Sequence, residues 1–307
     1  MRTSNIRLLI LAAVLLVLNA WLFWLQPNGK SLDFDPKQYT VVDTTAISQV
    51  VLIKGEMQNT LTKDRSWSLN EQYATDPTFV KILMNVLNQF QLSREVTGAQ
   101  REELLSRKDE AITVSVAGER PLDFSILGNP NRTIAYLIDG SDDVYQIEIP
   151  GYVDYIGSIF ELTTDQWRNR QVINGNWRSI QKLTINYSDP TQPDLKIAFD
   201  KDFFKVEGVA ALDSNQVVSY LNLFEHLQAN ERISLGKYQV YDSLMQTEPI
   251  AILTMDDIYF GEPRSIRFYP VLPGQRIQLA TDPTGEPVIF EPRRVSELLA
   301  KPEDFRY

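Results

Sequence analysis

The chain has 307 residues, of which 43% are hydrophobic, and it carries 40 acidic against 30 basic side chains. This length and apolar content predict two domains, each with a core of its own. The excess of acidic side chains repels phosphate backbones, so nucleic acid is not expected as a partner. The sequence has no cysteine, which excludes disulfides, thiolate nucleophiles and cysteine metal ligands.

Residues 1–30 are interpreted as a cytoplasmic tail and a transmembrane signal anchor. An apolar stretch begins at Leu8 and ends at Leu25, and as a helix it would span about 27 Å, close to the hydrocarbon thickness of a bilayer. Trp21 and Trp24 stand at its far end, where aromatic rings favour the membrane interface. A cleaved signal peptide is the alternative, but the stretch is longer than a usual signal core and has a poor cleavage site.

The orientation of this anchor is inferred from the charges on its two sides. Arg2 and Arg7 precede the apolar stretch, whereas the lysines that follow it are offset by nearby aspartates. Because basic residues remain on the cytoplasmic side, the N-terminus is expected in the cytoplasm. A single-pass protein of a bacterial inner membrane, with its large C-terminal part in the periplasm, is therefore predicted.

The remaining sequence is predicted to contain two diverged copies of one domain, residues 31–173 and 174–307. Each copy opens with a strand-like run, at residues 47–53 and 180–185, followed by a short second strand. An aromatic residue two positions before an aliphatic one comes next, at Trp67 in the first copy and Phe204 in the second.

A helix follows at the same distance in both copies. Asp76 stands before a proline, and Asp213 stands three residues before Gln216, so both helix starts carry capping signals. Apolar residues then recur at the i, i+3, i+4, i+7 spacing of an amphipathic helix. They are Val80, Leu83, Met84 and Leu87 in the first copy, and Val217, Tyr220, Leu221 and Phe224 in the second.

The second half of each copy is predicted to be strands joined by short turns, which favour antiparallel neighbours. The expected strands are residues 112–116, 122–127, 133–138 and 144–149, then 250–255, 265–271, 276–281 and 287–290. The fold class is thus α+β, with two tandem copies of a mainly antiparallel sheet-plus-helix domain and a linker at residues 174–176.

Both copies close on a helix and a shared terminal signature. The signature residues are Asp165, Trp167 and Arg168 in the first copy, and Asp304, Phe305 and Arg306 in the second. The chain stops one residue after the second signature, so it is expected to be complete. The recurring aromatic residues are interpreted as core residues, and the arginines as caps or as partners of acids in the same copy.

Few groups in the sequence suit catalysis. His226 is the only histidine, and helical spacing places it opposite the apolar stripe, so a surface position is expected. No nucleophile elbow, Walker A loop or dinucleotide fingerprint occurs. Adjacent acid pairs at residues 102–103, 142–143 and 256–257 are interpreted as surface charges. No catalytic, cofactor-binding or metal-ligating residue is therefore predicted.

One N-terminal membrane helix followed by two passes of strand, aromatic-x-aliphatic step, Asp-started helix and Asp-x-Trp-Arg-like ending resembles the bacterial domain-of-unknown-function family 4340. The resemblance covers residues 40–307, and the second copy departs from it with Phe204 and Phe305 where the first has tryptophan. It implies a membrane-anchored, extracytoplasmic protein found beside gliding-motility-type ABC transporter components.

A non-enzymatic accessory protein of an ABC-type transport complex is the leading expectation, with the bilayer and a permease as partners. A free-standing periplasmic ligand-binding or scaffold protein is the alternative, with a ligand between the two copies. A carboxylate-dependent hydrolase is a third, which would need two acids converging in a pocket with pKa values pushed apart.

Overall fold

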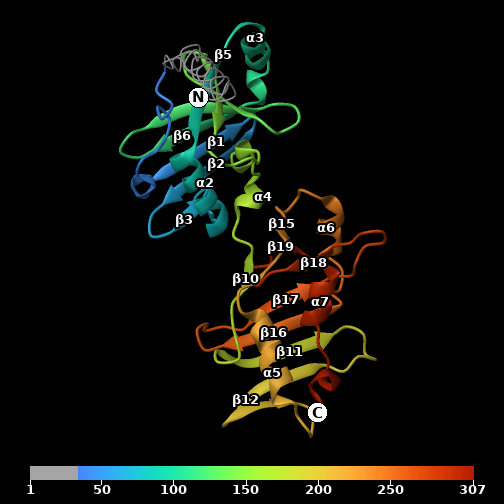
Figure 1. The fold of residues 1–307 in the computed structure, drawn as a ribbon. Helices are drawn as coiled ribbons and strands as arrows, with labels where there is room; N and C mark the ends of the chain where they lie inside the picture. Colours follow the sequence, from blue (N-terminus) through green and yellow to red (C-terminus); the bar gives the residue numbers. More distant parts are fainter. Residues whose placement is uncertain (1–33) are drawn as a thin grey trace, which may run out of the picture.

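The computed structural model describes residues 34–307, and the predicted membrane anchor lies outside this range. None of the helices within residues 34–307 combines the length and the apolar character needed to cross a bilayer. The described chain contains two large antiparallel sheets and a two-stranded one, with helices packed against the large sheets, which confirms the predicted α+β class. Figure 1 shows one domain built on each sheet, with a single stretch of chain between α4 and β10 leading from one to the other.

The first sheet has nine strands in the order β4-β3-β2-β1-β6-β7-β8-β9-β5, and every adjacent pair is antiparallel. Its strands are β1 Gln49–Lys54, β2 Met57–Lys63, β3 Trp67–Leu69, β4 Tyr73–Ala74, β5 Gln91–Val96, β6 Ile112–Ala117, β7 Leu122–Gly128, β8 Ala135–Ile138 and β9 Val144–Glu148.

Alternation of apolar and polar residues gives this sheet one buried face. Val50, Leu61 and Leu69 lie on neighbouring strands in register, and all three are fully buried. Helix α2 (Pro77–Gln89) covers this face with Val80, Leu83, Val86 and Leu87. Its first turn is fixed locally, because the Asp76 carboxylate accepts a hydrogen bond from Thr78 N at 2.9 Å.

Shorter helices complete the first domain. Helix α3 (Gly98–Ser106) contributes Leu104 to a smaller core with residues of β8 and β9. Helix α4 (Thr164–Trp167) follows the sheet and carries a capping box formed by Thr163 and Gln166. The 3-10 turns are η1 Thr44–Ala46, η2 Lys108–Glu110 and η3 Ile156–Ile159.

The second sheet has eight strands in the order β13-β12-β11-β16-β17-β18-β19-β15. Its strands are β11 Ile180–Tyr187, β12 Leu195–Asp200, β13 Phe203–Val206, β15 Glu231–Arg232, β16 Ala251–Asp257, β17 Arg264–Phe268, β18 Gln278–Thr281 and β19 Pro287–Phe290. Helices and turns beside it are α5 Ser214–Leu221, η4 Asn222–Phe224, α6 Gln239–Leu244, α7 Pro292–Leu298 and η5 Pro302–Phe305.

Apart from β4, the two sheets have the same strand order. The strands β13, β12, β11, β16, β17, β18, β19 and β15 of the second sheet correspond to β3, β2, β1, β6, β7, β8, β9 and β5 of the first. The registers agree as well, because Leu183, Ile197 and Val206 pair across the second sheet as Val50, Leu61 and Leu69 pair across the first. This second set is also buried. β4 is the one strand of the first sheet without a counterpart in the second.

The two terminal signatures occupy equivalent places. Asp76 N donates to Trp167 O, and Asp213 N donates to Phe305 O, both at 2.9 Å. This pairing aligns Trp167 with Phe305, so that Glu303 rather than Asp304 takes the place of Asp165. The predicted match between the two aspartates is thus out of register by one residue.

The passage between the domains begins earlier than the predicted linker at residues 174–176. Strand β10 (Gln171–Ile173) pairs with β14 (Leu227–Gln228), and both Val172 and Ile173 pack in the core of the second sheet. These residues were expected at the end of the first copy, but their apolar side chains are buried with the second.

Candidate functional site

The junction between the two domains holds a cluster of three basic and three acidic side chains. Arg168 pairs with Glu286, Lys237 Nζ lies 2.7 Å from Asp165 Oδ2, and Arg232 Nη1 lies 2.8 Å from Asp282 Oδ2. The formal charges of the cluster sum to zero. We call these six residues the junction cluster: Asp165, Arg168, Arg232, Lys237, Asp282 and Glu286.

Short elements from both domains position the cluster. Asp165 lies in α4 and Arg168 directly follows that helix, so both belong to the first domain. Arg232 lies in β15, Lys237 in the loop after it, and the two remaining acids in the turn between β18 and β19. Two of the ion pairs, Arg168 with Glu286 and Lys237 with Asp165, therefore join one domain to the other.

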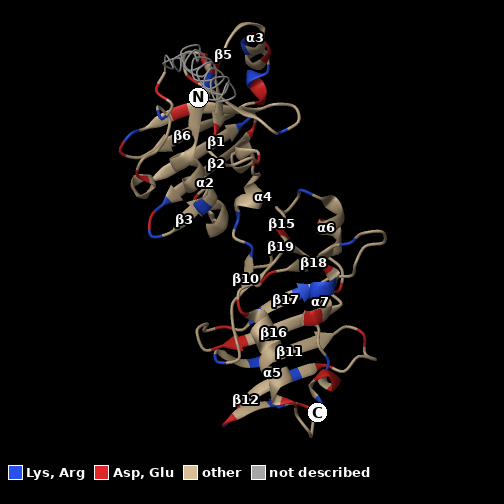
Figure 2. Cartoon of the chain, viewed as in Figure 1, with Lys and Arg blue, Asp and Glu red and all other residues tan. Residues whose placement is uncertain are grey.

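Backbone hydrogen bonds reinforce the junction at the connecting chain. Arg232 Nη2 donates to Gln171 O at 3.0 Å, and its Nε donates to Asn169 O. Ala229 N donates to Arg170 O at 2.9 Å. The segment between the domains is thus bound to the second domain along its length. Figure 2 shows basic positions in this segment between α4 and β10.

Burial makes the pairing of these charges necessary. The side chains of Asp165, Arg168, Arg232 and Asp282 are all less than 10% exposed, and an unpaired charge at such a depth is strongly destabilising. Ser234 donates to Asp165 as well. Buried charges in a junction favour one defined arrangement of the parts that contribute them.

Two carboxyl groups of the cluster have lowered pKa values. Burial alone would raise the pKa of Asp165, but hydrogen bonds from Lys237 and Ser234 outweigh it and leave the pKa below its usual 3.8. Burial likewise opposes the hydrogen bonds from Thr284 and Arg232 at Asp282, whose pKa is also lowered. A hydrolase would need one acid with a raised pKa, so these two acids do not favour that alternative.

A hollow of about 420 Å³ opens beside the cluster. Both domains line it, with amide, guanidinium, carboxylate and hydroxyl groups. The lining residues are Gln72, Tyr73, Ala74, Arg168, Asn169, Gln171, Arg232, Asp282, Thr284 and Glu286. Arg168 stacks its guanidinium 4.1 Å from the centre of the Tyr73 ring.

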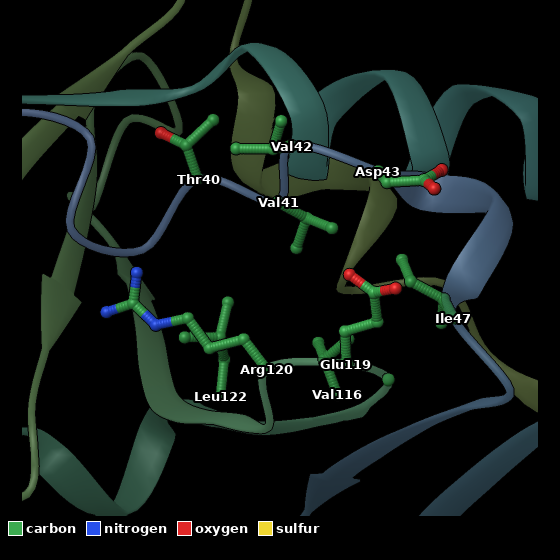
Figure 3. Close-up of a pocket in the computed structure, with 10 residues that line it drawn as sticks. Thr40, Val41, Val42, Asp43, Ile47, Val116, Glu119, Arg120 and Leu122 are labelled. Atoms are coloured by element: carbon green, nitrogen blue, oxygen red, sulfur yellow. The ribbon is translucent and has the colours of Figure 1, made fainter.

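A second hollow, of about 270 Å³, lies within the first domain (Figure 3). Its walls are mainly apolar and come from the segment before β1 and from β6 and β7, with Val41 and Leu122 on opposite sides. Arg120 stands toward one end in this view, and Asp43 and Glu119 toward the other. The rim thus carries charges of both signs, and all the residues that line this hollow belong to the first domain.

The other residues singled out from the sequence lie in different surroundings. Trp167, Phe204 and Phe305 are buried in their domains' cores, whereas Trp67 is only partly buried at the edge of the first core. Arg168 has an acid of its own copy, Asp165, at 3.7 Å, but its shorter contact is with Glu286 of the second domain.

His226 is exposed as expected, but it lies outside the helix. The second helix ends at Leu221 and continues as a 3-10 turn, so His226 stands in the following turn with a φ of 55°. Its backbone N–H donates to Asn174 Oδ1 at 3.0 Å.

The three adjacent acid pairs lie on different elements and do not form a common site. Glu102 and Glu103 are exposed on α3, while Asp142 and Asp143 lie near Lys108 and Arg101. Asp256 and Asp257 are neighbours on β16, and Asp257 is buried. Within residues 34–307, no three acidic or histidine side chains are grouped so as to hold a metal ion.

Four members of the junction cluster were not singled out from the sequence: Arg232, Lys237, Asp282 and Glu286. Isolated charges in short loops carry no periodic signal, and their significance comes from partners 50 to 118 positions away in the chain. No family model matches the sequence, and no curated protein or solved structure matches it.

Proposed function

We propose that the chain is a membrane-anchored, extracytoplasmic accessory protein without enzymatic activity, which docks on a partner in the membrane such as the permease of an ABC-type transport complex. Residues 8–25 would be its anchor, with the N-terminus in the cytoplasm and both domains in the periplasm. The apolar length of this stretch and the basic residues before it support this topology.

The junction cluster is the observation that carries the proposal. Its charges neutralise one another across the two domains, as in a structural joint, and the backbone bonds at residues 169–171 hold the connecting chain. Two sheets joined in this way form an extended body that presents several surfaces at fixed positions, which suits docking.

We also propose that the two domains are diverged copies of one ancestor. The shared strand order, the equal register of the paired apolar residues and the equivalent bonds of Asp76 and Asp213 support a duplication. Kinship with the domain-of-unknown-function family 4340, and with it the association with ABC-type transport, is proposed on the sequence resemblance alone.

Extraction in mild detergent after crosslinking in cells tests the docking function. The tagged full chain is expected to recover a permease or ATPase of a transport complex, identified by mass spectrometry. A variant with residues 8–25 replaced by an unrelated apolar helix should recover the same partner if the domains make the contact. Recovery of the chain alone in both cases would contradict the proposal.

A second candidate function is a receptor whose ligand binds at the domain junction. The hollow of about 420 Å³, lined by both domains, favours it. A thermal-shift screen of the full chain against glycans, lipids, peptides and organic acids should then find a stabilising ligand. A flat result in every class would exclude this function.

A further inference from the structure

Glu286 is one of the four residues of the junction cluster that line the hollow, together with Arg168, Arg232 and Asp282. Arg168 Nη2 donates to its Oε2, and Arg232 Nη1 donates to the same oxygen at 3.2 Å. The Glu286 side chain is 33% exposed, whereas those of Arg168 and Arg232 are 3% and 9% exposed. A partly exposed carboxylate thus covers two buried guanidinium groups.

The backbone at Glu286 is fixed independently of this side chain. Glu286 N donates to Asp282 Oδ1 at 3.0 Å, and Asp282 N donates to Glu286 O at 2.9 Å. Thr284 also donates twice to Asp282 Oδ1. Because these bonds hold the turn, only side-chain rotation would be needed to move the Glu286 carboxylate away from the two arginines.

The two guanidinium groups would remain in place if Glu286 swung out. Arg232 is still held by Asp282 and by two backbone carbonyls, and Arg168 by its stacking on Tyr73. Arg168 Nε is buried and has no hydrogen-bond partner among the described residues. The donors Arg168 Nη2 and Arg232 Nη1, which now bind Glu286 Oε2, would then be free for another anion.

We propose that this site binds a carboxylate group of a ligand, and that Glu286 is an internal competitor which occupies the site when the ligand is absent. The ligand's carboxylate would take the place of the Glu286 oxygen between the two arginines. The amides of Gln72, Asn169 and Gln171 line the same hollow and suit a polar group next to that carboxylate.

The charge of the cluster selects a monoanion. Three cations face three anions, so replacing the Glu286 charge with one ligand charge leaves the junction neutral. A phosphate dianion would add a second negative charge close to Asp282, which already shares Arg232. A carboxylate is therefore the favoured oxyanion.

This inference rests on the receptor function and names its ligand class. Its test is a calorimetric titration of the full chain in mild detergent with N-acetylglycine, which has one carboxylate beside an amide. Glu286→Gln removes the competing charge and retains the side-chain size, so N-acetylglycine should bind the variant about tenfold or more tighter than the native chain.

Glu297→Gln is the matched control, because Glu297 is exposed on α7, pairs with Arg293 and Arg294, and lies away from any hollow described above. This variant should bind N-acetylglycine no better than the native chain. Glu286→Asp shortens the side chain by one methylene and so moves its carboxylate away from the arginines. This variant should bind N-acetylglycine more tightly than the native chain but less tightly than Glu286→Gln. It provides the same test if Glu286→Gln does not fold.

Unchanged affinity in a folded Glu286 variant would overturn the inference, as would preference for inorganic phosphate over N-acetylglycine. If a neutral ligand stabilised the native chain while the Glu286 variants gained nothing, the carboxylate assignment would fall and the receptor function would stand.

Discussion

At the scale of single residues, equivalent positions of the two domains have different roles. Arg168 and Arg306 both make a backbone bridge, with Thr75 and Leu212 respectively, but the Arg168 side chain is buried at the junction whereas Arg306 is exposed. Both arginines follow a buried aromatic residue at the end of their domain. The same signature therefore closes a core in both domains and binds the other domain only in the first.

Trp167 offers a test of the core part of this signature. Its side chain is fully buried, and its Nε1 has no hydrogen-bond partner among the described residues. Trp167→Ala should lower the free energy of unfolding of the first domain by about 3–5 kcal/mol. Trp167→Phe, which copies Phe305, should lower it much less, because the ring refills most of the space and the unpaired N–H is removed.

Chemical denaturation followed by circular dichroism would measure both changes. Trp67→Phe is the control: Trp67 is only partly buried, so this substitution should lower the free energy of unfolding only slightly. Equal losses for Trp167→Ala and Trp167→Phe would show that the indole N–H has a partner that matters more than the packing.

Core aromatic residues could be predicted from the sequence because they recur in both copies. The junction charges could not, since an acidic surface offers many carboxylates and only the packing of the domains selects Asp282 and Glu286 from them. Asp165 was singled out for its place in the signature, and its contact with Lys237 lies 72 positions away. Contacts at such separations leave no local pattern.

At the scale of elements, local signals placed the strands and helix starts well. Strand β6 and strand β19 begin at the predicted residues, and α2 begins directly after Asp76. Strand β17 is shorter than expected, since it ends at Phe268, two residues before Pro270. Strand β5 was missed: its sequence alternates poorly, and it pairs with β9 at the edge of the sheet rather than with a sequence neighbour.

The two helix caps should differ in strength. Asp213 accepts only backbone bonds, from Asn215 N and Gln216 N, so Asp213→Ala should cost about 1 kcal/mol. Asp76 is buried and also accepts from Arg170 Nε at 3.1 Å, so Asp76→Ala should cost distinctly more.

Denaturant midpoints of the two variants would measure this difference. Thr78→Ala is a suitable control at the first helix, because it leaves the backbone N–H that Asp76 caps. Equal losses for the two aspartates would mean that the contact between Asp76 and Arg170 contributes nothing to stability.

At the scale of the whole molecule, the junction should respond to acid in a defined range. The pKa values of Asp165 and Asp282 are lowered in the folded chain, so the stability that they contribute is complete above their ordinary value of 3.8 and is lost as the pH falls further. Small-angle scattering should therefore show a constant interdomain arrangement at neutral and mildly acidic pH, and a more open one below about pH 3.8.

Asp165→Asn provides the comparison for this titration. It removes the partner of Lys237 and should loosen the junction already at neutral pH, with a smaller change on acidification. Asp142→Asn, at an ion pair away from the junction, should behave like the native chain. Opening of the native chain between pH 5 and 6, or an Asp165→Asn variant identical to it, would contradict the assignment of the junction to these carboxylates.

The position of Glu286 in the chain has a consequence for the order in which the protein is made. Domains fold as units from the N-terminus during synthesis, so the first domain can close its core once Trp167 has emerged. Asp165 and Arg168 would then have each other, at 3.7 Å, and the Tyr73 ring, until Lys237 follows 72 residues after Asp165 and Glu286 follows 118 residues after Arg168. During that interval the newly made domain exposes a charged end, and a nascent chain interrupted before residue 286 would keep it exposed permanently.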